Sequence, residues 1–225
     1  ASEHRGLTTR IVLPLRPDKA EITLERARDG LATSGLRSLL FLRNIKRLEW
    51  VDGERTGHAD VSDNSDGIRS IRSVLPDGTP HRERFLILSR SVEQHEQRKQ
   101  YEVKAALRMN DGGELIPEEA PTRLMVFFET QEITGLHFLI HGPFQLTDNR
   151  ANIKLDDAWN AELIETLGSL VADSLAGLRD RGLLKRGVME LLPNAGDELP
   201  TIFAPIRSIV AKRFTSEALI ASHAG

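Results

Sequence analysis

The sequence predicts an α+β domain whose mainly antiparallel sheet carries its helices chiefly on one face, with a small helical tail at the C-terminus. Between residues 52 and 121, short alternating apolar and polar segments are separated by turn signals, a pattern typical of antiparallel strands. Residues 157–181 instead repeat leucine at helical spacing. The 225-residue length suffices for a sizeable core, and the absence of cysteine excludes disulfides and thiolate metal sites.

Three units are predicted: residues 1–18, 19–192 and 193–225. In the first, residues 9–16 alternate like a strand and stop at Pro17. This strand is either the last strand of an upstream ATPase domain or an edge strand of the present domain. Residues 18–46 then follow a helical pattern, and residues 47–51 return to a strand pattern. The apolar face of the helical part is made by Leu36, Leu39, Leu40, Leu42 and Ile45.

The middle of the chain is interpreted as a meander of strands at residues 68–75, 84–92 and 101–109. Its turns are predicted at Pro76-Asp77-Gly78 and at residues 110–113, where glycine and asparagine favour tight turns. The polar segments 56–67 and 113–121 are expected to be loops.

Leu124–Phe128 is an unbroken apolar run and predicts a buried strand. A turn at Thr134-Gly135 leads to a second strand over residues 136–141, which ends at Gly142-Pro143 because proline donates no amide hydrogen bond. The polar segment Gln145–Lys154 is then expected to be a loop held between a sheet and a long helix. Such loops are favoured places for binding residues.

The long helix is predicted from Asp156 or Asp157, as its cap, to about Arg181, with Gly182 in the terminating position. Residues 183–192 are compatible with a short helix or with a loop and strand. The final unit is predicted to contain two helices, at residues 201–213 and 215–222.

Composition argues against several classes of function. Thirty basic and thirty-three acidic residues give a net charge of −3, and aromatic residues make up 5%, so no nucleic-acid partner is indicated. The sequence has neither a signal-peptide core nor an apolar run of about 20 residues, so we expect a cytoplasmic protein without a membrane partner. Motifs for a P-loop, a dinucleotide fold or a serine-hydrolase elbow are absent from the sequence.

Two groups of side chains are candidates for a catalytic or metal-binding site. His137 and His141 are four residues apart in strand-like sequence, which would separate them by roughly 13 Å, too far for one metal ion. Glu129, Glu132 and Asp148 could supply a carboxylate pair for acid–base chemistry, but residues at strand ends often look like this. Structural roles are favoured for both groups.

The segment VFFETQEITGLHFLIHGPFQLTDNRANI, followed by a long amphipathic helix, resembles the region after the ATP-binding domain in bacterial sacsin-like GHKL ATPases. More distantly, its order of strand, Gly-Pro, Asn-Arg loop and helix is similar to the middle domain of ninety-kilodalton heat-shock chaperones. In that family a basic residue from such a loop reaches the terminal phosphate of ATP bound by the neighbouring domain. The chaperones also place a glutamine four residues after the arginine, where this chain has Lys154.

The resemblance implies that Arg150 is the catalytic residue and that Asn149, Asn152 and Lys154 contact the nucleotide. ATP and Mg²⁺ would be held by a GHKL ATPase domain, expected on the same polypeptide before residue 1, and no cofactor is expected in the isolated chain. The chain would then be a transducer module, not a self-sufficient enzyme. The alternative is a free-standing protein-interaction domain that uses its sheet edge or its C-terminal helices. For Arg150 itself, the alternative is that it merely pairs with Asp148 or Asp157 and fixes the loop. A protein client and a homodimer are left open as further partners.

Overall fold

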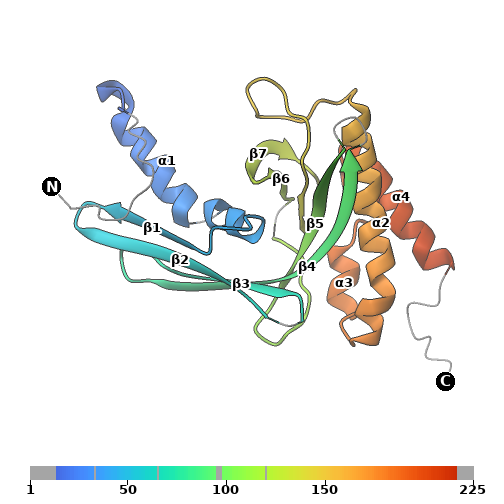
Figure 1. Cartoon of the computed structure of the whole chain (residues 1–225). Coiled ribbons are helices and arrows are strands. Elements are labelled where there is room, and N and C mark those ends of the chain that lie inside the picture. Colours follow the sequence, from blue (N-terminus) through green and yellow to red (C-terminus); the bar gives the residue numbers. More distant parts are fainter. Residues whose placement is uncertain (1–13, 33, 65, 95–97, 120, 217–225) are drawn as a thin grey trace.

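The computed structural model describes residues 14–32, 34–64, 66–94, 98–119 and 121–216, and these contain one eight-stranded sheet (Figure 1). The strands are β1 Arg47–Asp52, β2 Arg55–Asp63, β3 Ile68–Val74, β4 Pro80–Gln94, β5 Lys99–Met109, β6 Arg123–Val126, β7 Phe128–Ile133 and β8 Leu139–His141. Their order across the sheet is β1-β2-β3-β4-β5-β8-β6-β7. Among these strands β6 and β8 pair in parallel and the other neighbours pair antiparallel, which confirms the predicted fold class.

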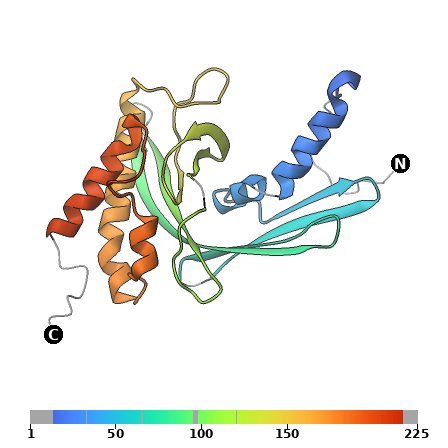
Figure 2. The same cartoon turned by 180° about the vertical axis from the view of Figure 1, so that it is seen from behind.

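The described helices divide between two ends of the sheet. They are η1 Pro17–Lys19, α1 Ala20–Ala32, η2 Ser34–Leu40, α2 Ala158–Asp180, α3 Arg186–Leu191, η3 Thr201–Phe203 and α4 Ala204–Ser216, where η denotes a 3-10 helix. Figures 1 and 2 show α2, α3 and α4 together beside β4 and β5, whereas α1 and η2 lie over β1, β2 and β3. Not one of the helices in these described ranges combines the length and apolar character that a bilayer crossing requires.

Alternation along the strands creates two apolar cores on opposite faces of the sheet. Phe85 belongs to the cluster beneath η2, and its neighbour Leu86 belongs to the cluster beneath α2. Successive side chains of a strand point to opposite faces, so the two clusters are separated by the sheet itself. We call them the α2 core and the η2 core.

The α2 core is built on the predicted long helix. The Asp157 side chain accepts a hydrogen bond from the backbone of Asn160, and Gly182 adopts φ +67° just beyond the helix, so both ends were predicted correctly. At Gly168 a Cβ atom would lie 2.9 Å from Ile209 Cδ1 of α4, so glycine allows the two helices to approach closely. The C-terminal helical segment is thereby packed into this core, with Phe203, Ile206 and Val210 buried.

The η2 core is smaller and is covered by a single short helix. Leu36, Leu39, Leu40 and Phe41 are buried against β2, β3 and β4. The helical pattern predicted for residues 18–46 is thus divided into α1 and η2. Helix α1 projects away from the sheet, and its Ile22 and Leu24 are exposed.

Of the two segments expected to be loops, one contains a strand of the sheet. The prediction for residues 56–67 was wrong, because β2 pairs with both β1 and β3. The buried residues of β2 include Gly57 and Ala59, which are too small to produce a visible apolar stripe, and the Trp50 ring fills the space above Gly57. The described residues of 113–121 lie outside the named strands, as expected for a loop, although Leu115 forms an isolated bridge to Met109 and is buried.

The strand predicted at Leu124–Phe128 is interrupted. The chain reverses at Phe127, whose φ of +62° places it in the left-handed region, so β6 ends at Val126 and β7 begins at Phe128. The strand expected over residues 136–141 is confined to Leu139–His141. Of the ambiguous residues 183–192, α3 occupies residues 186–191.

At the C-terminus, η3 and α4 occupy residues 201–216 as a continuous helical stretch. The helix predicted for residues 215–222 lies mostly outside the described residues, as does most of the strand predicted at residues 9–16.

Candidate functional site

The segment Gln145–Lys154, which the sequence singled out, folds as a small β-hairpin. Leu146 and Ile153 form an antiparallel bridge, and the backbone amide of Lys154 donates to the Gln145 carbonyl at 3.0 Å. At the tip, the amide of Arg150 donates to the Thr147 carbonyl at 2.7 Å. Figure 1 shows the hairpin as the gold loop that projects from the same side of the molecule as α1.

The base of the hairpin is clamped by Asn160, in the first turn of α2. Its Nδ2 donates to the carbonyls of Gln145 and Lys154, both at 2.9 Å, and its Oδ1 accepts from the Gln145 amide at 2.8 Å. Asn160 is fully buried, so these bonds are shielded from competing water. The hairpin is therefore fixed at its base to the longest helix of the domain. Sequence analysis missed this residue because nothing distinguishes it from other polar residues near a helix start.

The tip is held by an asparagine turn. Asn149 Oδ1 accepts from the Thr147 hydroxyl at 2.7 Å and from the Ala151 amide at 3.0 Å. The next residue, Arg150, has φ +56°, a conformation that costs free energy for a residue with a Cβ atom. Asn149 is thus committed to shaping the turn, which leaves its side-chain oxygen less available to a nucleotide.

The side chain of Arg150 is exposed and has no hydrogen-bond or ion-pair partner among the described residues. The alternative in which Arg150 pairs with Asp148 or Asp157 is therefore not observed in the described part of the chain. Asn152 and Lys154 are also exposed on the hairpin. The four residues implied by the resemblance are brought together on one hairpin, with the guanidinium at its tip.

The hairpin is also bonded to the edge of the sheet. The amide of Gln131 in β7 donates to the Ala151 carbonyl at 2.8 Å, and Glu132 Oε2 accepts from the Ile153 amide at 3.1 Å. Glu132 is therefore a structural acceptor here. Glu129, by contrast, is an exposed residue of β7. No group of three metal-ligating side chains is found within the described ranges.

The two histidines occupy different environments. His137 Nδ1 lies 3.3 Å from the Glu118 carbonyl, and its Nε2 lies 3.8 Å from Asp197. His141 is buried between Phe41, which stacks on it at 4.7 Å, and Phe127, which meets it edge-on at 5.1 Å. Neither of its ring nitrogens has a partner in the described structure, and burial lowers the pKa of His141 to about 3. It is therefore neutral at physiological pH and is part of the η2 core.

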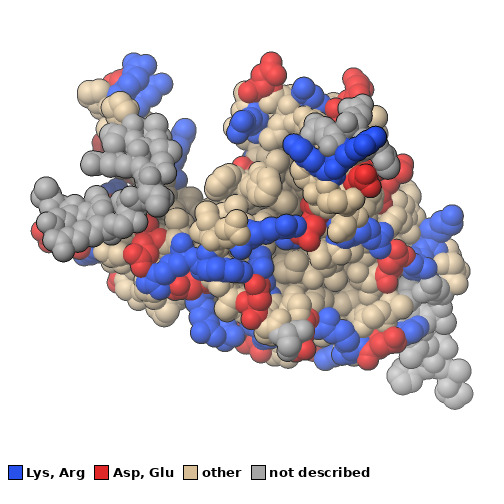
Figure 3. All heavy atoms as spheres, viewed as in Figure 1, with Lys and Arg blue, Asp and Glu red and all other residues tan. Residues whose placement is uncertain are grey.

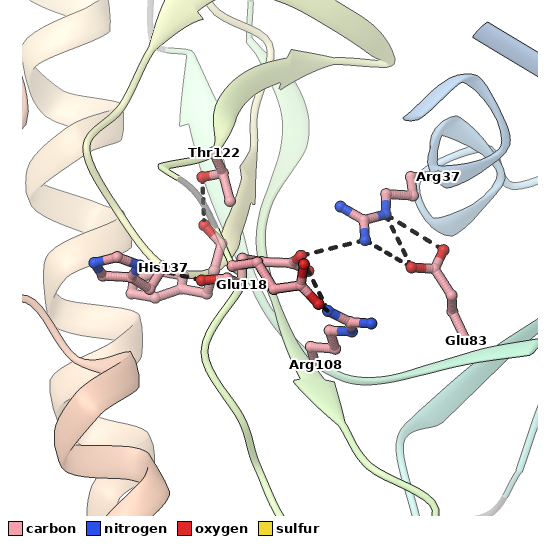
Figure 4. A network of polar contacts seen from close by, with 8 residues as sticks. Arg37, Glu83, Arg108, Glu118, Thr122 and His137 are labelled. Carbon is pink, nitrogen blue, oxygen red and sulfur yellow. Dashed lines mark hydrogen bonds and ion pairs between the residues drawn. The ribbon is translucent and has the colours of Figure 1, made fainter. Parts of the chain in front are cut away.

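A second polar cluster, not anticipated from the sequence, joins η2 to the sheet (Figure 4). Arg37 of η2 donates to Glu83 at 2.6 Å and lies 3.2 Å from Glu118, and Arg108 approaches Glu118 at 3.8 Å. Desolvation raises the pKa of the buried Glu118 carboxyl. These four residues are far apart in the sequence and come from separate elements, so no local pattern could have predicted the cluster.

Outside this cluster the surface charges are mixed. Figure 3 shows acidic and basic groups interspersed over the visible face of the molecule, without an extended region of one sign. The hairpin arginine is thus distinguished by its position at the tip of the hairpin, not by a broad positive surface.

Comparisons with protein-family models, with curated proteins and with solved structures found no match to this chain.

Proposed function

We propose that this chain is the middle, or transducer, module of a GHKL-type ATPase and that its hairpin presents Arg150 to the terminal phosphate of ATP bound by a neighbouring domain. The observation that carries the proposal is an exposed guanidinium, free of described partners, at the tip of a hairpin clamped by Asn160. An arginine paired within the chain would have to break that pair before it could serve another site.

The chemistry of phosphoryl transfer suits a guanidinium in this position. Negative charge spreads over the oxygens of the transferred group in the transition state, and a planar two-pronged donor can contact two of them. The sequence contains no phosphate-binding loop of its own, so the nucleotide and its Mg²⁺ would be held by the neighbouring domain. The chain would then complete an ATP site without binding ATP tightly by itself.

The hairpin is hydrogen-bonded to a helix and to a strand of the domain, as a transducer requires. Its base is bonded to α2 through Asn160, and its side is bonded to β7 through Gln131 and Glu132. A movement of the hairpin on nucleotide contact would therefore act on the helix and on the sheet edge together. Through these contacts, a change in the bound nucleotide could be transmitted to a client protein.

The test is Arg150→Ala in the full-length protein. Turnover is expected to fall by about 10²-fold or more while ATP affinity is nearly unchanged, because the contact is made mainly in the transition state. Arg150→Lys should recover part of the loss, since a point charge lacks the two-pronged geometry. The matched control is Asp148→Ala, an exposed change on the same hairpin, which should leave turnover near the wild-type value.

An unchanged turnover number for a folded Arg150→Ala protein would remove the catalytic role. Lys154→Ala would then be examined, because Lys154 is the second exposed cation of the hairpin. If neither change affects turnover, the hairpin does not contribute to ATP hydrolysis.

A protein-interaction domain remains the second candidate, favoured by the apolar edge of the sheet. Phe127, Phe128 and Ile133 are 47%, 66% and 51% exposed along β7 and the turn before it, and exposed apolar side chains that lie together can mark a protein-contact surface. Under this alternative, Phe128→Asp removes a protein that co-purifies with the full-length chain, and Arg150→Ala retains it. The ATPase proposal predicts instead that Arg150→Ala strongly lowers turnover and that Phe128→Asp does not.

A further inference from the structure

Among the described residues, no helix covers the face opposite η2 on β2, β3 and the first residues of β4, whereas the rest of β4 lies under α2. Figures 1 and 2 show η2 and α1 on one side of β1–β3 and no described helix on the other side. A pocket of about 560 Å³ lies on this open face. Its lining includes His58, Asp60, Arg72, Val74, Pro80 and Arg82.

Strand register brings the two arginines of this pocket together. Arg72 of β3 lies directly opposite Arg82 of β4, and Asp60 of β2 lies opposite Arg72 on its other side. Directly opposed residues of an antiparallel pair have Cβ atoms about 4.5–5.5 Å apart, and like charges in this arrangement repel one another. The two guanidinium groups can therefore converge on one small anion.

Within the described ranges, this pair of charges is not neutralised by an acidic side chain. Neither Arg72 nor Arg82 has a hydrogen-bond or ion-pair partner among the described residues. The nearest carboxylate in the register, Asp60, is engaged by Arg47 at 3.0 Å through both of its oxygens. Other arginines of the sheet are paired: Arg69 contacts Asp63 and Arg90 contacts Asp173. The open pocket thus holds a local excess of positive charge.

The apolar part of the lining restricts the class of ligand. Val74 and Pro80 are direct partners in the register and lie two residues from Arg72 and Arg82 on the same face. A ligand with an anionic group on the arginines would place its adjoining part against these apolar side chains. The pocket volume falls within the range of about 300–1,000 Å³ that is usual for small-molecule sites.

We propose that this pocket binds an organic phosphate, with the phosphate bridging Arg72 and Arg82 and the organic group resting on Val74 and Pro80. Phosphate is favoured over a single carboxylate because its three terminal oxygens can accept from two guanidinium forks at once. The site lies on the face of the sheet opposite η2 and does not depend on the ATPase proposal.

The proposal is tested by titrating the 225-residue chain with phenyl phosphate, inorganic phosphate and benzoate, followed by calorimetry and amide NMR shifts. Phenyl phosphate should bind most tightly, and the amides of β3 and β4 around the pocket should shift. Arg72→Gln and Arg82→Gln should each weaken phenyl phosphate binding about 10-fold, as expected for loss of one charge-assisted contact. The matched control is Arg26→Gln, which removes an exposed arginine of α1 that also lacks a described partner.

Each other outcome overturns the proposal. An equal loss of affinity in Arg26→Gln would mean that general charge attraction, not the pocket, accounts for binding. Benzoate binding as tight as phenyl phosphate binding would exclude selectivity for phosphate, and inorganic phosphate binding equally well would exclude the apolar contact. The absence of saturable binding by any of the three probes would reject the site. Because both arginines are exposed, the variants should fold, and circular dichroism would verify this.

Discussion

The two apolar cores on opposite faces of the sheet differ in how completely their buried polar groups are paired. Beside the α2 core, Asn160 makes three side-chain hydrogen bonds, and the hydroxyls of Thr122 and Thr134 bond to each other and to backbone carbonyls. On the η2 side, Ser73 Oγ, Glu118 Oε1 and both ring nitrogens of His141 are buried without a partner in the described structure.

This contrast indicates different roles for the two faces. A buried polar group without a partner costs about 1–3 kcal/mol, so the η2 face carries a stability cost that the α2 face avoids. The η2 core is also covered by one short 3-10 helix, whereas α2 covers the other face and is itself packed against α4. We infer that the α2 core determines the stability of the domain and that η2 is the layer more easily displaced.

The largest expected difference comes from deleting apolar volume in each core. Leu167→Ala, at a fully buried position of α2, should lower the free energy of unfolding by about 4 kcal/mol. Leu39→Ala in η2 should cost about 2–3 kcal/mol, because a one-layer cover can relax into the cavity. Urea unfolding of both variants measures the difference. Equal losses would mean that η2 is packed as rigidly as α2.

The next effect concerns the ion cluster that attaches η2. Arg37→Met leaves the carboxylates of Glu83 and Glu118 buried without their main partner, which should cost about 3 kcal/mol at pH 7. The loss should shrink at acidic pH, because desolvation raises the pKa of the Glu118 carboxyl and favours its neutral form there. Arg43→Met is the control, because its pair with Glu102 is exposed and should contribute about 0–1 kcal/mol. A loss at pH 7 no larger than that of the control would contradict a role for the cluster in attaching η2.

The clamp and the unpaired histidine permit a direct comparison of the two faces. Asn160→Leu should cost about 2–3 kcal/mol, since backbone groups of Gln145 and Lys154 lose their partner, and it should accelerate amide exchange in the hairpin. His141→Leu replaces a buried group that has no described partner, so it should be neutral or stabilising by about 1 kcal/mol. Destabilisation by both changes to the same extent would erase the distinction between the faces.

The last effect in this series is the pH dependence contributed by His141, which vanishes at neutral pH. Its pKa is about 3 in the folded state, against an ordinary value of 6.5, so the unfolded chain binds the proton more readily between these values. The contribution of neutral, buried His141 to the free energy of unfolding is therefore complete above pH 6.5. It is lost as pH falls below that value, by about 2 kcal/mol between pH 7 and pH 5. His141→Phe should remove that part of the pH dependence, as measured by urea unfolding at each pH. An unaltered pH profile in the variant would show that His141 is not responsible.

Local signals in the sequence were sufficient for several elements of the fold and for part of the site. The helix from Asp157 to Gly182 was predicted because apolar periodicity, an N-cap and a terminating glycine all act within a few residues. The antiparallel strands of the middle region followed from alternation and turn residues for the same reason. Arg150 was selected because its segment resembles the GHKL family, and its catalytic role stays a prediction; the structure places it exposed on a hairpin.

Tertiary structure alone decided how those elements combine. The position of β8 between β5 and β6, the reversal at Phe127, the Asn160 clamp and the Arg37 cluster all depend on contacts between residues distant in the chain. The opposed arginines of the open face also arise only once β3 and β4 are in register. Residue propensity and hydrophobic periodicity depend only on residues that are close together in the sequence. Strand register, burial and the pairing of buried charges are set only when the strands assemble into the sheet and the helices pack on its two faces.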